Sequence, residues 1–226
     1  MQITAIKKKN TRKYAFDIDG HYAFFLTPEE LRQFGLYETV SLLGEEGGDE
    51  LDVPLSDENY NIIIRENVIP RGKKYALGLL ADREYSERGI SDKLLQTGYC
   101  EKDKDEIVSY LKESGFLSDD RFAEGYIRLR IASKSKRYIE QKLMSKGISS
   151  ECIKNAFDTI EDELAEAGSG SELMCREAIM KVLRSKLKIS DAEDKDKQTA
   201  VIRKLLRQGY RYSDINEAIL DFFSAI

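Results

Sequence analysis

The sequence predicts a mainly α-helical protein in which three tandem three-helix repeats form an extended curved solenoid, preceded by a small N-terminal module rich in β-hairpins. Three observations predict this class. A leucine followed four residues later by a glycine, and then by an apolar residue, recurs five times. Three of these segments extend into a longer shared pattern. Only three of the 226 residues are prolines, 34% are charged and 41% are hydrophobic, a composition that favours a soluble, helix-rich chain.

The recurring segment is typified by Leu143, Gly147 and Ile148. Its spacing is that of a Schellman helix ending, in which the glycine takes the left-handed conformation and the next side chain packs on the leucine. The other four copies place their leucine and glycine at Leu31 and Gly35, Leu94 and Gly98, Leu111 and Gly115, and Leu205 and Gly209. Five matches predict five helix ends.

Three of these glycines belong to a longer unit. Apolar or small residues follow at the ninth, tenth and thirteenth positions, and an aliphatic residue precedes each leucine by four positions, spacings typical of a helix face. Each unit therefore contains a helix, a glycine stop and another helix. At the sixth position after the glycine, Ile153 and Ile215 match, but the first unit has Lys104, so we expect its third helix to start later. The shared positions are Ile90, Ile107, Val108 and Leu111; Ile139, Ala156, Phe157 and Ile160; and Val201, Ala218, Ile219 and Phe222.

Residues 1–44 are expected to form the small β-rich module. Alternating polar and apolar residues predict strands at 2–8, 13–18 and 22–26, with Asp19-Gly20 as a type I′ hairpin turn. Thr27 and Glu30 have the spacing of a capping box, with Pro28 at the first helical position. The short helix that they begin should end at Gly35, and residues 40–43 could add a final strand.

Residues 45–58 are predicted to be an acidic linker. Glycines loosen this stretch, and its carboxylates are Glu45, Glu46, Asp49, Glu50, Asp52 and Asp57. So many carboxylates leave a metal site open as an alternative. No EF-hand ligand order is present, however, and a solvated linker is the favoured interpretation.

The three repeats are assigned to residues 59–116, 117–163 and 164–226. In the first repeat we expect helices at 60–83, interrupted around Pro70, at 86–97 and at 103–114. In the second, Ser118 is the expected N-cap, and helices follow at 135–146 and 149–160, before a polar connection at 161–171 that contains Gly168-Ser169-Gly170. The third has helices at 172–187, 196–208 and 213–222. The buried face of the helix after Ser118 is assigned to Phe122, Ala123, Tyr126, Ile127 and Leu129.

One three-helix unit buries little by itself, whereas three stacked units form a continuous core and a long surface. That architecture favours the binding of long partners over the enclosure of a small substrate. The net charge of −5 argues against a wholly basic nucleic-acid binder. No run approaches the roughly 20 apolar residues of a membrane span, and no signal-peptide core is present, so we expect a cytoplasmic protein without a membrane partner.

Catalysis finds little support in the sequence. The single histidine, His21, follows the hairpin turn and is expected on an exposed strand. Cys100, Cys152 and Cys175 lack CxxC spacing and are interpreted as buried, reduced thiols. We therefore predict no enzyme activity, no catalytic residue, no metal site and no cofactor.

Several segments resemble the RecX regulators of the RecA recombinase. Residues 115–123 (GFLSDDRFA) resemble the signature of that family, residues 86–94 (SERGISDKL) with Gly98-Tyr99 resemble its preceding segment, and residues 138–148 fit its next one. The resemblance covers about residues 73–222. Ser118 replaces a usual aspartate, Gly89 a common glutamate and Ser135-Lys136 a frequent Gly-Pro pair, but none of these differences removes a core position.

The resemblance implies a function by binding. RecX proteins lie along the helical groove of the RecA filament on single-stranded DNA, where they inhibit ATP hydrolysis and strand exchange and promote filament loss. It follows that this chain would act as a monomer on that filament, in recombination, DNA repair and the SOS response. A weak direct contact with DNA is compatible with the same surface.

Basic residues supply the predicted partner-binding site. Residues 126–148 contain seven cations and one acid, Glu140, which gives a local charge of +6. Such a patch suits an acidic protein groove or phosphates. An alternative is a direct DNA-binding array of helix-turn-helix-like modules, and a passive helical scaffold is a third possibility. The predicted contacts are Arg128, Arg130, Lys134, Lys136, Arg137, Lys142 and Lys146, with Arg184, Lys204 and Arg207 in the third repeat.

Overall fold

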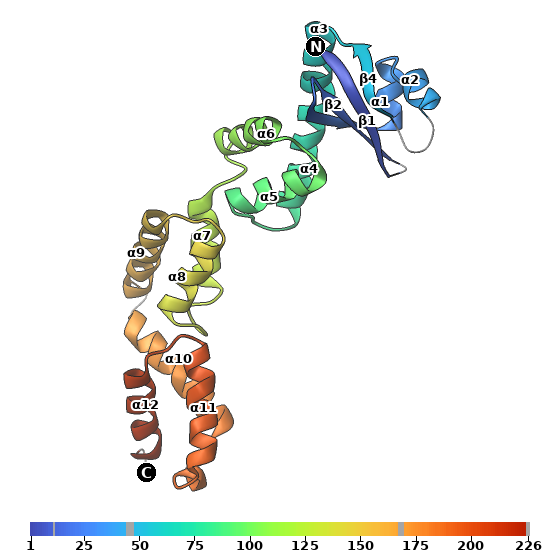
Figure 1. The fold of residues 1–226 in the computed structure, drawn as a ribbon. Coiled ribbons are helices and arrows are strands. Elements are labelled where there is room, and N and C mark those ends of the chain that lie inside the picture. The colour runs from blue at the N-terminus through green and yellow to red at the C-terminus, as the bar shows by residue number, and fades with distance from the viewer. Residues whose placement is uncertain (11, 44–47, 167–169, 225–226) are drawn as a thin grey trace. The chain divides into compact units, whose positions relative to one another are not determined.

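The computed structural model describes residues 1–10, 12–43, 48–166 and 170–224, and shows a mainly helical chain with one antiparallel sheet near its N-terminus (Figure 1). The predicted fold class is confirmed in these features. The chain divides into two compact units, Met1–Ser118 and Asp119–Ile226. Residues 44–47 of the predicted linker region and Gly168-Ser169 of the predicted polar connection lie outside the described residues.

The sheet is built from β1 (Gln2–Asn10), β2 (Lys13–Ile18), β3 (His21–Leu26) and β4 (Gly48–Pro54), in the order β3-β2-β1-β4 with antiparallel neighbours. The predicted hairpin turn is confirmed, because Asp19 and Gly20 both have positive φ angles, 48° and 81°, as a type I′ turn requires.

Two predictions between the sheet and the first repeat are wrong. Residues 40–43 form no strand, since α2 (Tyr37–Leu42) covers most of this stretch and buries Val40. Part of the predicted acidic linker is a strand, β4, which pairs with β1. The physical reason is an alternation within the acidic stretch: Leu51 and Val53 pack against the core, whereas Asp52 between them is exposed.

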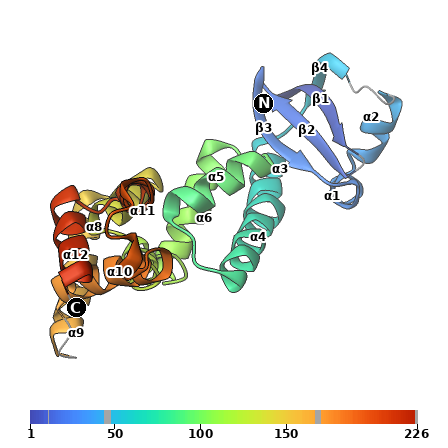
Figure 2. The same cartoon turned by 90° about the horizontal axis from the view of Figure 1, so that it is seen from below.

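The helix α1 (Pro28–Gln33) begins with the predicted capping box. The Glu30 backbone N–H donates to Thr27 Oγ1 at 3.4 Å, and the Thr27 backbone N–H donates to Glu30 Oε2 at 2.7 Å. A long helical run follows the sheet. It comprises α3 (Asp57–Ile62), a π-helical segment η1 (Ile63–Val68) and α4 (Ile69–Asp82) (Figure 2). Pro70 lies in the first turn of α4, where a missing backbone N–H costs little.

The first repeat continues with α5 (Glu87–Thr97) and α6 (Glu101–Glu113). The expected late start of its third helix is wrong, because α6 begins at the third residue after Gly98. The third helices of the other repeats, α9 (Ser150–Glu166) and α12 (Tyr212–Ser224), start at the same offset from their glycines. Lys104 fits the register because its side chain is only 15% exposed, while its Nζ reaches Glu101 at 2.5 Å and Asp105 at 2.9 Å.

The C-terminal unit contains α7 (Asp119–Arg128), α8 (Lys136–Ser145), α9, α10 (Ser171–Lys186), the 3-10 turn η2 (Ile189–Asp191), α11 (Lys195–Arg207) and α12. The predicted connection at 161–171 is wrong over its first part, because α9 continues to Glu166 and Leu164 extends its apolar stripe. Leu129, assigned to the buried face of α7, is 79% exposed because α7 ends one residue before it.

All five predicted glycine helix endings are confirmed. Each glycine has a positive φ angle, and the backbone N–H of the residue after it donates to the carbonyl of the leucine four residues before it. The donor–acceptor pairs are Leu36 to Leu31 at 2.9 Å, Tyr99 to Leu94 at 3.1 Å, Phe116 to Leu111 at 2.9 Å, Ile148 to Leu143 at 3.2 Å and Tyr210 to Leu205 at 3.3 Å.

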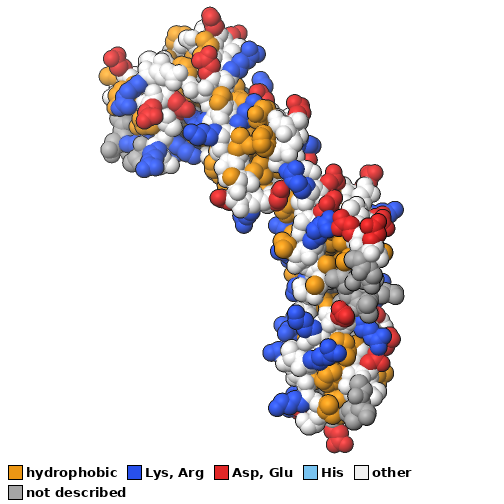
Figure 3. Space-filling view, turned by 180° about the vertical axis from the view of Figure 1, so that it is seen from behind, with side chains coloured by type: hydrophobic (Ala, Val, Ile, Leu, Met, Phe, Trp, Pro, Cys, Tyr) orange, Lys and Arg blue, Asp and Glu red, His pale blue; other side chains and the backbone are white. Residues whose placement is uncertain are grey.

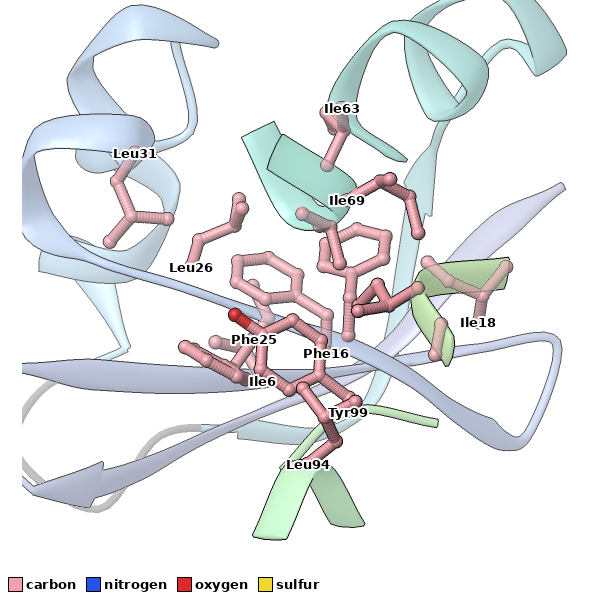
Figure 4. Packing of buried hydrophobic residues seen from close by; sticks show 14 of the residues in the cluster. Ile6, Phe16, Ile18, Phe25, Leu26, Leu31, Ile63, Ile69, Leu94 and Tyr99 are labelled. Carbon is pink, nitrogen blue, oxygen red and sulfur yellow. The ribbon is translucent and has the colours of Figure 1, made fainter. Parts of the chain in front are cut away.

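The described buried residues gather into three apolar clusters. One cluster joins the sheet to the first repeat, with Phe16 and Leu26 of the sheet packed in the same core as Ile69, Leu94 and Tyr99 (Figure 4). The second repeat has its own cluster around Ile139, Leu143 and Phe157. The third repeat has another, around Ile179, Leu183 and Leu205.

Candidate functional site

The basic segment, residues 126–148, covers the end of α7, a turn and α8. The N-cap of α8 is Ser135, whose Oγ accepts the backbone N–H of Tyr138 at 3.2 Å and which is 9% exposed. This cap fixes where the turn ends, and it brings Lys134, Lys136 and Arg137 to the start of α8. The predicted cations of this segment therefore lie around one helix N-terminus and along the helix that follows.

Two cations of the basic segment are paired with carboxylates of α9. Arg128 Nη2 lies 2.8 Å from Glu163 Oε1, and Lys136 Nζ lies 3.0 Å from Glu161 Oε1. The hydrogen bond with Glu163 raises the pKa of Arg128, and the same bond lowers the pKa of Glu163. The net charge around the basic segment is therefore smaller than the +6 counted along the sequence, because α9 places carboxylates beside two of its cations.

Four other cations lie over aromatic rings. Arg130 is 3.8 Å from the ring centre of Tyr126, and Lys146 is 5.8 Å from that of Phe122. Lys134 and Lys142 lie 5.1 Å and 5.7 Å from the centre of the Tyr138 ring. Cation–π contacts of this kind orient a long side chain without neutralising its charge, so Arg130, Lys134 and Lys142 keep their charge for a partner.

A cleft of about 1070 Å³ lies between the second and third repeats. The predicted residues Lys134, Lys136 and Arg137 line it together with Arg211, which precedes α12 and was not among the predicted contacts. Its walls also carry Glu140, Glu161, Asp214 and Glu217, and its apolar part includes Phe157, Ile179 and Tyr210. Burial raises the pKa of the Tyr210 hydroxyl to about 12. The cleft is therefore mixed in charge and not a simple anion site.

A close backbone approach joins the two repeats beside this cleft. The backbone N–H of Ser135 donates to the carbonyl of Gln208 at 3.3 Å. A Cβ atom added to Gly209 would lie 2.3 Å from Ser135 Oγ and 2.9 Å from Tyr138 Cβ. Glycine is therefore required at position 209 for two reasons: its φ of +86° is unfavourable for other residues, and a side chain would have no space.

The remaining predicted contacts lie on the third repeat and do not line the cleft. Arg184 is exposed in the last turn of α10. Lys204 and Arg207 lie in the last turn of α11, where Arg207 Nε donates to the carbonyl of Arg203 at 3.3 Å. Cations at a helix C-terminus also interact favourably with the helix dipole. The structure therefore divides the predicted site into a cluster around α8 and separate cations on α10 and α11.

Other features bear on function only weakly. His21 is exposed on β3. The three cysteines are thiols outside any disulfide. They are half-buried, whereas the sequence predicted that they are buried. Within the described ranges, no helix is both long and apolar enough to cross a membrane.

The fold and the surface together define a class of protein: tandem three-helix repeats behind a small antiparallel sheet, with cations displayed on repeat helices. A family model described as "RecX, second three-helix domain" matches residues 118–156, which include α7 and α8. The chain is similar to RecX proteins, and relatives named regulatory protein RecX support a RecX regulatory role.

Relatives support this assignment over nearly the whole chain. The regulatory protein RecX of Clostridium acetobutylicum is 29% identical over 227 residues, covering 99% of this chain and 95% of the relative. That of Caldanaerobacter subterraneus subsp. tengcongensis is 29% identical over 156 residues, covering 69% and 73% of the two chains. A crystal structure of regulatory protein RecX is similar in fold, with a TM-score of 0.54 at 21% identity, over 96% of this chain and 98% of that one. The crystal structure of RecX from Lactobacillus salivarius has a TM-score of 0.54 at 23% identity and covers 71% of this chain and 99% of its own.

Proposed function

We propose that this chain binds the RecA filament on single-stranded DNA and inhibits its ATP hydrolysis and strand exchange, shortening the life of the filament. The observation that carries the proposal is the coverage of 99% of the chain by a relative named regulatory protein RecX, since the alignment then spans the residues of the sheet and of all the proposed repeats. In this proposal the protein acts as a cytoplasmic monomer in recombination, DNA repair and the SOS response.

In the proposed mechanism, the bound protein restricts the movement of RecA subunits. Repeats at residues 59–116, 117–163 and 164–226 would contact neighbouring subunits and restrict the motions that are coupled to ATP turnover. Lys134, Arg137 and Lys142 are the preferred contacts, because they lie together around α8 and Tyr138. Arg128 and Lys136 rank below them, since their charges are opposed by Glu163 and Glu161.

The test is a triple charge reversal, Lys134→Glu, Arg137→Glu and Lys142→Glu, assayed in the DNA-dependent ATPase of RecA. We expect inhibition to be lost while helical content, measured by circular dichroism, is unchanged. The matched control, Lys9→Glu, Lys154→Glu and Lys195→Glu, changes the net charge equally at exposed positions elsewhere and should still inhibit. Undiminished inhibition by the first variant would contradict the surface assignment.

Direct DNA binding is the second candidate, favoured by the grouping of cations on and beside α8. It predicts tight binding to naked single-stranded DNA whose affinity falls steeply with salt, because each phosphate contact releases counterions. Titration of labelled DNA without RecA at several salt concentrations separates the two functions. Binding that is weak without RecA and strong to the filament favours the first.

A further inference from the structure

The second helix of every repeat exposes a large apolar side chain at the same position, three residues before its glycine. Leu95 of α5 is 37% exposed, Met144 of α8 is 50% exposed and Leu206 of α11 is 44% exposed. The leucine immediately before each of them is 0% exposed and fills the core. Packing within a repeat therefore uses the leucine and leaves its neighbour in water, where a large apolar side chain gains nothing for folding.

An arginine accompanies each of these apolar residues on the same helix face. Arg88 and Arg137 precede Leu95 and Met144 by seven residues, two helical turns, and Arg203 precedes Leu206 by three. All three arginines are exposed. Within the described residues, Arg137 and Arg203 form no ion pair, and Arg88 makes only a long contact of 4.0 Å with Asp92 in its own helix. Over the C-terminal unit, hydrophobic atoms are visible between Lys and Arg side chains (Figure 3).

This pairing of an apolar and a cationic side chain discriminates between kinds of partner. A nucleic-acid backbone is bound by cations, and an exposed Leu or Met adds little to that contact. A protein surface gains from both, since an apolar anchor fills a pocket at the centre of an interface and arginine is enriched beside it. The recurrence in all three repeats further indicates a partner that offers the same site several times.

We propose that the outer faces of α5, α8 and α11 are three copies of one protein-docking surface. Each copy would insert its docking residue, Leu95, Met144 or Leu206, into an apolar pocket rimmed by carboxylates, and the accompanying arginine would pair with the rim. The partner that fits is a polymer of identical protein subunits. This inference rests on the proposed function and assigns the contact to the protein of the filament instead of its DNA.

The experiment compares two triple variants of the full chain. The docking variant carries Leu95→Gln, Met144→Gln and Leu206→Gln. The control variant carries Leu42→Gln, Ile189→Gln and Leu220→Gln, at positions that are 87%, 57% and 61% exposed but outside the repeat register and the basic segment. Glutamine is a good helix former, so both variants should retain wild-type helical content and thermal stability. Dissociation constants are measured for RecA filaments on single-stranded DNA and for naked single-stranded DNA, and sedimentation gives the mass of each protein alone.

We expect the docking variant to bind the filament at least about tenfold more weakly than the wild type, with the control variant within about twofold. Its binding to naked DNA should be unchanged. Equal losses in both variants, or an equal loss on naked DNA, would overturn the inference. A wild-type dimer that the docking variant dissociates would also overturn it, because the surface would then hold a second copy of the chain. If the docking variant binds as the wild type does, only this inference fails, whereas no wild-type binding to filaments removes the proposed function and the inference with it.

Discussion

Two junctions in this chain are built in different ways. The sheet and the first repeat share one apolar core, in which residues of β2, β3, α4 and α5 pack together. The second and third repeats keep separate cores and meet beside a polar cleft, through the contact of Gly209 with Ser135. The first junction is therefore fixed by burial, and the sheet is part of the first repeat's core. The second depends on a close fit of two backbones, which a single methyl group can disturb.

Removing Arg71 should have the largest effect on unfolding free energy, because it removes the polar contacts that link α4 to β3 and α1 at the first junction. Arg71 of α4 bonds both carboxylate oxygens of Glu30, donates to the carbonyl of Phe25 at 2.9 Å and lies 4.1 Å from the centre of the Phe25 ring. Arg71→Ala leaves the Glu30 charge unpaired in a site where only 13% of its side chain is exposed, so we expect a loss of about 3–5 kcal/mol in unfolding free energy.

Urea unfolding followed by circular dichroism measures the effect of Arg71→Ala. The control is Arg83→Ala, which removes an exposed guanidinium at the end of the same helix, next to Tyr85. A control loss above about 1 kcal/mol, or equal losses for the two variants, would contradict the assignment of Arg71 to the junction.

Gly209→Ala tests the second junction and should come next. The left-handed backbone costs any residue with a Cβ atom about 1–2 kcal/mol, and the clash with Ser135 should add about 1 kcal/mol more. Gly35→Ala is the matched control, since Gly35 has a φ of +69° and a Cβ atom added there would meet nothing within 4 Å. The excess loss of Gly209→Ala over Gly35→Ala measures the close approach by itself. An excess near zero would mean that the two repeats do not depend on it.

Asp103 should add a pH dependence to the first junction. It is 3% exposed on α6, and its Oδ2 has no hydrogen-bond partner among the described residues. Burial raises the pKa of Asp103 above its ordinary 3.8, although a hydrogen bond with Cys100 opposes the shift. Because the pKa of Asp103 is higher in the folded state than in the unfolded state, protonation of this carboxyl stabilises the fold. This contribution is fully present below the unfolded-state pKa and is lost as pH rises through the folded-state pKa.

Asp103→Asn should therefore gain stability relative to the wild type as pH rises from about 4 to about 7, by about 1 kcal/mol, the usual scale for one unsatisfied buried polar group. Thermal unfolding of both proteins across this pH range measures the difference. The control, Asp82→Asn at an exposed position of α4, should show the same change of stability with pH as the wild type. If the difference in stability between Asp103→Asn and the wild type does not change with pH, the buried carboxyl is not the source of the pH dependence.

Glu161→Gln should have the smallest effect on unfolding free energy, because the ion pair that it breaks between α8 and α9, beside the cleft, is exposed. Lys136 Nζ and Glu161 Oε1 are 3.0 Å apart, with side chains 51% and 34% exposed. Exposed pairs of this kind contribute about 0.2–1 kcal/mol. We expect a loss of less than about 0.5 kcal/mol by urea unfolding, smaller still in high salt, and a loss above about 2 kcal/mol would mean that this ion pair is needed to hold α8 on α9.

The features predicted correctly from the sequence are local ones. The capping box at Thr27, the hairpin turn at Asp19 and the five glycine endings each depend on residues within a few positions of one another, so their spacing carries the information. Strand β4 was missed because its partner β1 lies far away along the chain, and its carboxylates conceal the alternation of Leu51 and Val53 with exposed positions.

The same distinction applies to the candidate site. Sequence reasoning identified the cations, but it could not show which of them have partners: Glu163 lies 35 residues after Arg128 and is brought to it only by the packing of α9 on α7. Arg211 was omitted from the predicted contacts because it joins Lys134 and Arg137 only where two repeats meet. The exposed residues Leu95, Met144 and Leu206 could have been found by aligning the repeats, since they occupy one register position.

The strand β4 has a consequence for the behaviour of the chain at high concentration. It forms one outer edge of the sheet and so covers β1, whose free backbone groups would otherwise offer a template for pairing with another molecule. Its own edge is poorly suited to such pairing, because Glu50 has a positive φ of 61° and both Glu50 and Asp52 are exposed. Acidic side chains and an irregular backbone are known ways to discourage edge-to-edge aggregation, so the stretch that looks like a spacer protects this edge of the sheet from pairing with another strand.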